Sequence, residues 1–172
     1  MGSGRFFHTA GGGPTAESAR DADAVKLATT RVGEIEVRED DIIFFPRGLL
    51  GFPALARYVV IARPEDGPFR RLQAIERPDL SFVIADPLVF FPRYRLPAAI
   101  EDLSAIELAD PADGVVAVIL TVPRDPRLIT ANLQAPVAIN TRARLGMQLI
   151  LSAPEYTAAH CIFSREGVPQ GA

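Results

Sequence analysis

The stretch VVAVILTVPRDPRLITANLQAPVAIN, residues 115–140, decides the fold class of this chain. It contains three short runs rich in valine, isoleucine and leucine, namely Val115–Val122, Ile129–Leu133 and Val137–Ile139. Prolines lie between these runs, and a proline cannot donate a hydrogen bond within a central ladder, so it marks the end or edge of a strand. Short apolar runs with this punctuation are typical of β-strands. The stretch therefore predicts three strands in succession.

The same pattern continues towards both ends of the chain. Further runs of this kind are Asp41–Phe45, Tyr58–Ile61, Leu72–Ile75, Leu80–Ile84 and Met147–Leu151, with near-alternation of apolar residues at 32–37. Many short strands separated by proline and glycine predict an all-β fold, either an antiparallel sandwich or a barrel. Strands do not alternate with long helices, which argues against a parallel sheet. We expect only short helical segments, at Pro97–Leu103 and Pro154–His160.

The length of the chain, 172 residues with 48% apolar composition, fits one domain. Residues 1–28 are rich in glycine and small residues and have little apolar periodicity, so we expect a flexible N-terminal tail. The folded domain is expected to span residues 29–165, followed by a C-terminal tail at 166–172.

Composition also excludes several classes of protein. The formal net charge is −3, which argues against direct binding to nucleic acid. A single cysteine, Cys161, allows no intramolecular disulfide and no multi-thiolate metal site. The longest purely apolar run, Val115–Leu120, is too short to span a bilayer, and the N-terminus has no apolar block typical of a secretion signal. We therefore expect a soluble cytoplasmic protein with no membrane partner.

Motifs of catalysis are absent from the sequence. It contains no dinucleotide fingerprint, phosphate-binding loop, zinc-protease motif or nucleophile elbow. Its two histidines are His8 and His160, far apart in the chain. His160 adjoins Cys161, but neighbouring side chains do not face one another in a strand or a helix, so they do not form a nucleophile pair. We expect no catalytic residue, no cofactor and no metal.

One segment has an unusual charge pattern. Residues 96–114 contain no basic residue and five acids, Glu101, Asp102, Glu107, Asp110 and Asp113. Such a run is either a solvated face or a negative patch that meets a basic partner and repels nucleic acid.

Four segments taken together resemble the FliW family of bacterial flagellar assembly factors. They are GEIEV (33–37) with DIIFFPRGLLGF (41–52), LQAIERPDLSFVIADP (72–87) with FPRY (91–94), LTVPRDPRLITANLQAPVAIN (120–140) with GMQLIL (146–151), and Tyr156, His160 and Phe163. Their order and spacing hold across about residues 31–163. Local departures are Leu50 in place of a usual proline, Arg71 in place of a frequent aromatic residue, and Cys161 in place of a common proline.

The resemblance implies a barrel-like β domain that works in the cytoplasm by binding proteins, without catalysis. Members of the family bind the RNA-binding translational regulator CsrA and relieve its repression of flagellin messenger RNA. They also bind newly made flagellin, so that export of flagellin frees the factor to capture CsrA. This antagonism is expected to be non-competitive, with the acidic segment disfavouring RNA beside bound CsrA.

The family-typical residues supply the candidates for partner binding: Phe45, Pro46, Leu49, Phe52, Asn132, Leu133, Pro136 and Asn140. Each also has a structural interpretation, as a core residue, a turn residue or a side chain that bonds loop backbone. Leu49 and Leu133 are the preferred exposed apolar contacts. Two other functions stay open, a nucleic-acid-binding barrel, which needs a basic groove with aromatic platforms, and a small-ligand barrel or enzyme, which needs a polar pocket.

Overall fold

The structure is a computed structural model that describes residues 24–30, 33–97 and 100–163, and the statements below concern those residues. The strands are β1 Ala24–Thr29, β2 Gly33–Arg38, β3 Ile42–Phe44, β4 Arg57–Ile61, β5 Phe69–Ala74, β6 Ser81–Ala85, β7 Gly114–Thr121, β8 Thr130–Ala131, β9 Val137–Asn140, β10 Leu145–Gln148 and β11 His160–Cys161. The helical segments are α1 Pro87–Phe90 and the 3-10 turns η2 Glu39–Asp41, η3 Pro64–Asp66, η4 Ile100–Ile106, η5 Pro111–Asp113 and η6 Pro126–Leu128.

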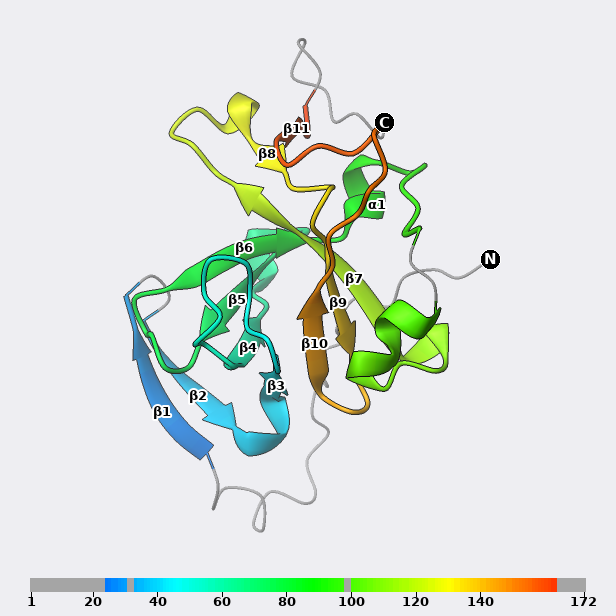
Figure 1. Cartoon of the computed structure of the whole chain (residues 1–172). Helices are drawn as coiled ribbons and strands as arrows, with labels where there is room; N and C mark the ends of the chain where they lie inside the picture. The colour runs from blue at the N-terminus through cyan, green and yellow to red at the C-terminus, as the bar shows by residue number, and fades with distance from the viewer. Residues whose placement is uncertain (1–23, 31–32, 98–99, 164–172) are drawn as a thin grey trace.

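Seven strands close into a barrel in the order β7-β6-β5-β4-β3-β10-β9, and β9 pairs with β7 to complete the ring (Figure 1). Strand β7 makes this closure possible because it is long. One edge pairs with β6, while the other pairs first with β9 and then with β8, which β11 extends. The predicted all-β barrel is confirmed. The expected antiparallel pairing holds around the ring except between β3 and β10, which run parallel at Phe44 and Leu145.

The core has two layers because successive residues of a strand face opposite sides. One face of the ring, with Ile43, Tyr58, Leu72, Ile84 and Ile139, fills the barrel interior. The residues that alternate with these along β6, β7, β9 and β10 point outwards. The segments from α1 to η5 and the C-terminal segment cover this outer face and make a second apolar cluster. The second layer positions the acidic segment against the barrel.

The N-terminal tail is shorter than the sequence predicts. Residues Ala24–Ala28, assigned to the tail, belong to β1, which pairs with β2 along its whole length. Backbone pairing with β2 stabilises this strand despite its weak apolar pattern, and that contact is invisible in the local sequence. Residues 1–23 and the expected boundary at 165 lie outside the described residues.

The predicted helices need correction as well. The helix expected at Pro154–His160 is wrong, since these residues form turns that lead into β11. Their backbone bonds instead to a distant segment, with the Leu133 and Gln134 amides donating to the Thr157 carbonyl at 3.0 and 3.3 Å. The segment expected at Pro97–Leu103 is a 3-10 helix at Ile100–Ile106.

Helix α1 is absent from the predicted elements, although Asp86 before Pro87 is a readable start signal. The Asp86 carboxylate accepts a hydrogen bond from the Leu88 amide at 2.8 Å and caps the helix. Helix α1 helps to cover the outer face of the sheet because Phe90 is buried in the second cluster.

Candidate protein-binding surface

The turn between β3 and β4 is built from buried family-typical residues. Phe45 and Leu49 are buried, and Leu49 forms a β-bridge with Phe52. Gly48 has a φ of +61°, and a Cβ there would collide with the Phe52 carbonyl oxygen. A Cβ at Gly146 would collide with the Phe45 ring. The expected exposure of Leu49 is therefore wrong, because the turn folds back on the barrel and encloses this side chain.

The exposed part of this turn is its tip. Pro46 is exposed, and Leu50 is 52% exposed. The Leu50 amide donates to the Gln148 side-chain oxygen at 2.9 Å, and the Gln148 amide group donates to the Ala135 carbonyl at 3.0 Å. These bonds tie the tip to the end of β10, where Ile150 is 69% exposed. The turn thus holds apolar side chains in solvent at a defined position.

The second group of candidates lies between β8 and β9 and is buried or half-buried. Leu133 is 2% exposed, so the expectation that it is an exposed contact is wrong. Its carbonyl accepts the Tyr94 hydroxyl at 3.1 Å, and its side chain belongs to the second core cluster. Pro136 is buried, and the half-buried Asn132 accepts the Ala135 amide at 2.9 Å. These residues support the surface from beneath.

Asn140 has the most informative position of the predicted residues. It ends β9, is 4% exposed, and makes four hydrogen bonds with its side chain. Its amide nitrogen donates to the carbonyls of Ile106 and Glu107, both at 3.0 Å. Its oxygen accepts the amides of Arg142 and Ala143, both at 3.0 Å. Asn140 therefore fastens the end of η4 to the barrel.

The end of η4 is a Schellman motif with an unusual residue in its left-handed position. The Glu107 amide donates to the Ser104 carbonyl at 3.0 Å, and the Leu108 amide donates to the Leu103 carbonyl at 3.3 Å. Glu107 has a φ of +54°, where glycine is normally found. Sequence patterns do not reveal this geometry, because no glycine marks the end of the helix.

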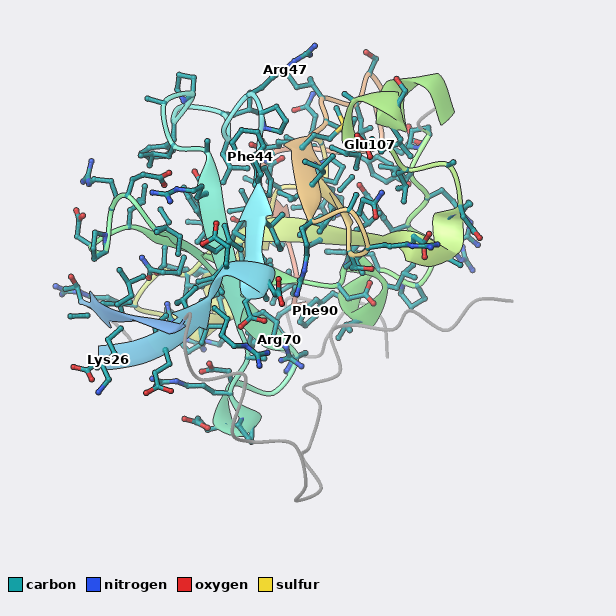
Figure 2. The ribbon with its side chains drawn as sticks, turned by 90° about the horizontal axis from the view of Figure 1, so that it is seen from below. Lys26, Phe44, Arg47, Arg70, Phe90 and Glu107 are labelled. Carbon is teal, nitrogen blue, oxygen red and sulfur yellow. The ribbon has the colours of Figure 1, made fainter. Side chains whose placement is uncertain are left out.

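Three of the acids in the acidic segment, Glu107, Asp110 and Asp113, have described side chains. Glu107 and Asp110 are exposed, while Asp113 is half-buried and lies 4.0 Å from Arg142. Asp110 also accepts the Ala112 amide at 2.8 Å and caps η5. In Figure 2, Glu107 lies beside the helical ribbon of η4, drawn in green, on the opposite side of the view from Lys26. The side chains of Glu101 and Asp102 lie outside the described set, so a five-residue negative patch stays a prediction.

A small hollow lies beside these acids. It has a volume of about 120 Å³ and is bounded by residues of the η4–η5 segment on one side and of β7 and β9 on the other. We call it the η4 hollow, and its walls include Leu103, Leu108, Ala109, Val115, Val116 and Ala138. The described residues that form these walls have apolar side chains, so they offer no functional group for a reaction or for a metal.

His160 and Cys161 form the short strand β11. The rings of His160 and Phe91 pack in a T-shaped arrangement, with centroids 5.1 Å apart, and Cys161 is exposed. In residues 24–30, 33–97 and 100–163, no group of three or more His, Cys, Asp or Glu side chains is arranged to hold a metal. No helix in that part of the chain is long and apolar enough to cross a membrane.

By its fold the chain is a small mixed β-barrel protein with an acidic flank. The family model described as FliW protein matches residues 26–162. The chain is 41% identical to the flagellar assembly factor FliW of Natranaerobius thermophilus, over 83% of this chain and 95% of that protein. It is 40% identical to that of Syntrophomonas wolfei, over 81% of this chain and 89% of that protein.

A solved structure agrees with these sequence matches. The crystal structure of a flagellar assembly factor FliW covers 83% of this chain and 99% of its own, with a TM-score of 0.78 and 36% identity. The chain belongs to the FliW family of flagellar assembly factors. This is a non-enzymatic family, and the chain is accordingly not an enzyme.

Proposed function

We propose that this protein acts in the cytoplasm as a flagellar assembly factor with two alternative protein partners. One is the translational regulator CsrA, whose repression of flagellin messenger RNA the protein antagonises, and the other is flagellin. The observation that carries the proposal is family membership across residues 26–162, which include the whole barrel. Flagellin holds the factor until it is exported, and the released factor then captures CsrA.

The charge of the molecule supports protein partners over direct binding to nucleic acid. The net charge is −3, and the exposed acids Glu107 and Asp110 lie together on one flank. A negative flank disfavours RNA next to a bound regulator without blocking the RNA site. Antagonism of CsrA by this route requires the acidic segment at 101–113 but not contact between this protein and RNA.

The proposed contacts with a partner lie at the exposed tip of the β3–β4 turn, next to the binding residues predicted from the sequence. Pro46 is exposed, Phe52 is half-exposed, and Leu50 presents an apolar side chain between them. The buried candidates Phe45 and Leu49 hold this tip in place from beneath. Substitutions at the tip are therefore expected to change binding, while substitutions beneath it change folding first.

Calorimetric titration of the full chain with CsrA and with flagellin from the same organism tests the proposal. We expect binding to each partner, and loss of CsrA binding after the protein is loaded with flagellin. Binding to flagellin alone would remove the translational role. Absence of heat with both partners, from a protein with a folded circular dichroism spectrum, would refute the proposal and favour a small-ligand barrel.

The proposed action of the acids has a separate test. The five substitutions Glu101→Gln, Asp102→Asn, Glu107→Gln, Asp110→Asn and Asp113→Asn remove the charge of the segment. We expect this variant, added at a concentration that saturates CsrA, to lose release of RNA from CsrA, measured by fluorescence anisotropy of labelled RNA. The control is Glu36→Gln in β2, an exposed acid outside the segment. Undiminished RNA release by the five-fold variant would contradict the electrostatic mechanism.

A further inference from the structure

The size and lining of the η4 hollow suit a single apolar side chain. Its volume is about 120 Å³, whereas pockets for drug-sized ligands run to roughly 300–1,000 Å³. A dry cavity of roughly 150 Å³ accommodates one benzene molecule, so this hollow has room for a branched aliphatic side chain.

Hydrogen bonds fix the backbone of one wall of the hollow. Leu103 and Leu108, which line it, are the two residues that the Schellman motif joins by a backbone hydrogen bond. Asn140 secures the same helix end through the carbonyls of Ile106 and Glu107. A hollow with such a wall is kept open without a ligand, so a partner does not have to form it on binding.

Two exposed acids adjoin the lining of the hollow along the chain. Along the chain, the lining residues Leu108, Ala109 and Pro111 are interleaved with the exposed acids Glu107 and Asp110. No base occurs in residues 96–114. An apolar hollow with acids adjoining its lining is complementary to an apolar side chain that has lysine or arginine beside it, and it disfavours the same side chain in an acidic segment.

We propose that the η4 hollow is an anchor pocket for one branched aliphatic side chain on a basic segment of a partner protein. The inference rests on the proposed protein-binding function and adds the place and the chemistry of one contact. The hollow supplies the apolar contact, and Glu107 and Asp110 supply charge pairing beside it. The anchor enters between η4 and β7.

The test uses the full chain labelled with ¹⁵N and titrated with synthetic peptides in NMR. The probe is a lysine-rich peptide with one central leucine. We expect saturable shifts of the Leu108, Ala109, Gly114 and Val116 amides. A matched peptide with alanine for leucine should bind about tenfold more weakly, as expected for loss of one buried leucine side chain, and a glutamate-rich peptide should not shift these amides.

Variants of the protein make the test specific. Ala109→Leu places bulk at the hollow and should abolish the peptide shifts, while Ala112→Leu, an exposed residue outside the lining, should keep them. Combined Glu107→Gln and Asp110→Asn should weaken the lysine peptide several-fold more than Glu36→Gln in the β1–β2 hairpin. Equal binding of the alanine peptide, or unchanged shifts in Ala109→Leu, would overturn the proposal.

Two further experiments identify what occupies the hollow. Deletion of residues 1–23 that shifts the same amides without any peptide would show that the chain's own N-terminal segment fills the hollow, and would also overturn the proposal. Calorimetry of Ala109→Leu with CsrA and flagellin should show weaker binding of at least one of them. If the wild-type protein bound neither partner while the peptide result held, the proposed function would fail and the pocket would stand.

Discussion

Truncation of Asn140 to alanine tests the connection between the barrel and the acidic flank. The substitution removes four side-chain hydrogen bonds, two to the carbonyls of Ile106 and Glu107 and two from the amides of Arg142 and Ala143. At about 1 kcal/mol for each bond the sum is about 4 kcal/mol. Three of the four bonds are partly accessible, so water replaces some of the loss, and we expect about 3 kcal/mol of destabilisation.

The assay is urea unfolding of the wild type, Asn140→Ala and the nearly isosteric Asn140→Asp. The aspartate keeps the acceptor for the two amides but turns a carboxylate oxygen towards two carbonyl oxygens, so it should destabilise at least as much as alanine. The urea concentration at the midpoint of unfolding should fall, with little change in the m-value, the dependence of the unfolding free energy on urea concentration. A loss below about 1 kcal/mol for Asn140→Ala, or wild-type stability of Asn140→Asp, would refute the role of this residue as the clamp of η4.

Four further substitutions test other parts of the structure. The buried Tyr58 hydroxyl has no hydrogen-bond partner among the described residues, so Tyr58→Phe should stabilise the protein by about 1 kcal/mol at pH 7. Burial also raises the pKa of Tyr58 from 10.0 to about 12. The Tyr58 phenol ionises near pH 10 in the unfolded state and near pH 12 in the folded state, so the free energy of unfolding of the wild type falls as the pH rises from 10 towards 12. Guanidinium unfolding at pH 8 and 11 should therefore show a smaller loss of stability in Tyr58→Phe than in the wild type. An equal loss in both would contradict the assignment. Glu107→Gly should raise the thermal midpoint by relieving about 1 kcal/mol of left-handed strain, and a lower midpoint would mean that the side chain makes a stabilising contact. Gly146→Ala should cost about 2 kcal/mol because its Cβ meets the buried Phe45 ring. Gly114→Ala should cost less in the same urea experiment, because its Cβ meets chiefly the end of the Leu108 side chain, which can shift.

Local pattern predicts the fold class and much of its detail. The runs Val115–Val122 and Val137–Ile139 correspond to β7 and β9, because alternation and proline punctuation reflect the backbone directly. The pattern fails where a strand depends on its partner. Strand β1 has little apolar signal of its own and exists through pairing with β2, and the segment at Pro154–His160 is held by distant backbone in place of a helix.

Prediction of the surface is weaker than prediction of the fold. The sequence predicts Leu49 and Leu133 in solvent, yet each is 2% exposed, because whether a turn leucine is buried depends on what the turn folds against. The exposed apolar residues Leu50 and Ile150 carry no mark in the sequence that separates them from core leucines and isoleucines. The family-typical residues of this chain are thus mainly buried residues that support the surface, and the exposed side chains belong to residues near them in the sequence.

The sequence by itself determined the β class, the acidic balance of the chain and the run of acids at 101–113, because composition and short-range periodicity are properties of neighbouring residues. Only the tertiary structure decided that β3 and β10 run parallel, that β7 closes the ring, and that Asn140 meets η4 from 34 residues away. It also decided the left-handed geometry of Glu107 and the hollow beside it. These features arise from contacts between segments distant in the chain, whose geometry depends on the packing of the whole barrel and not on any local pattern.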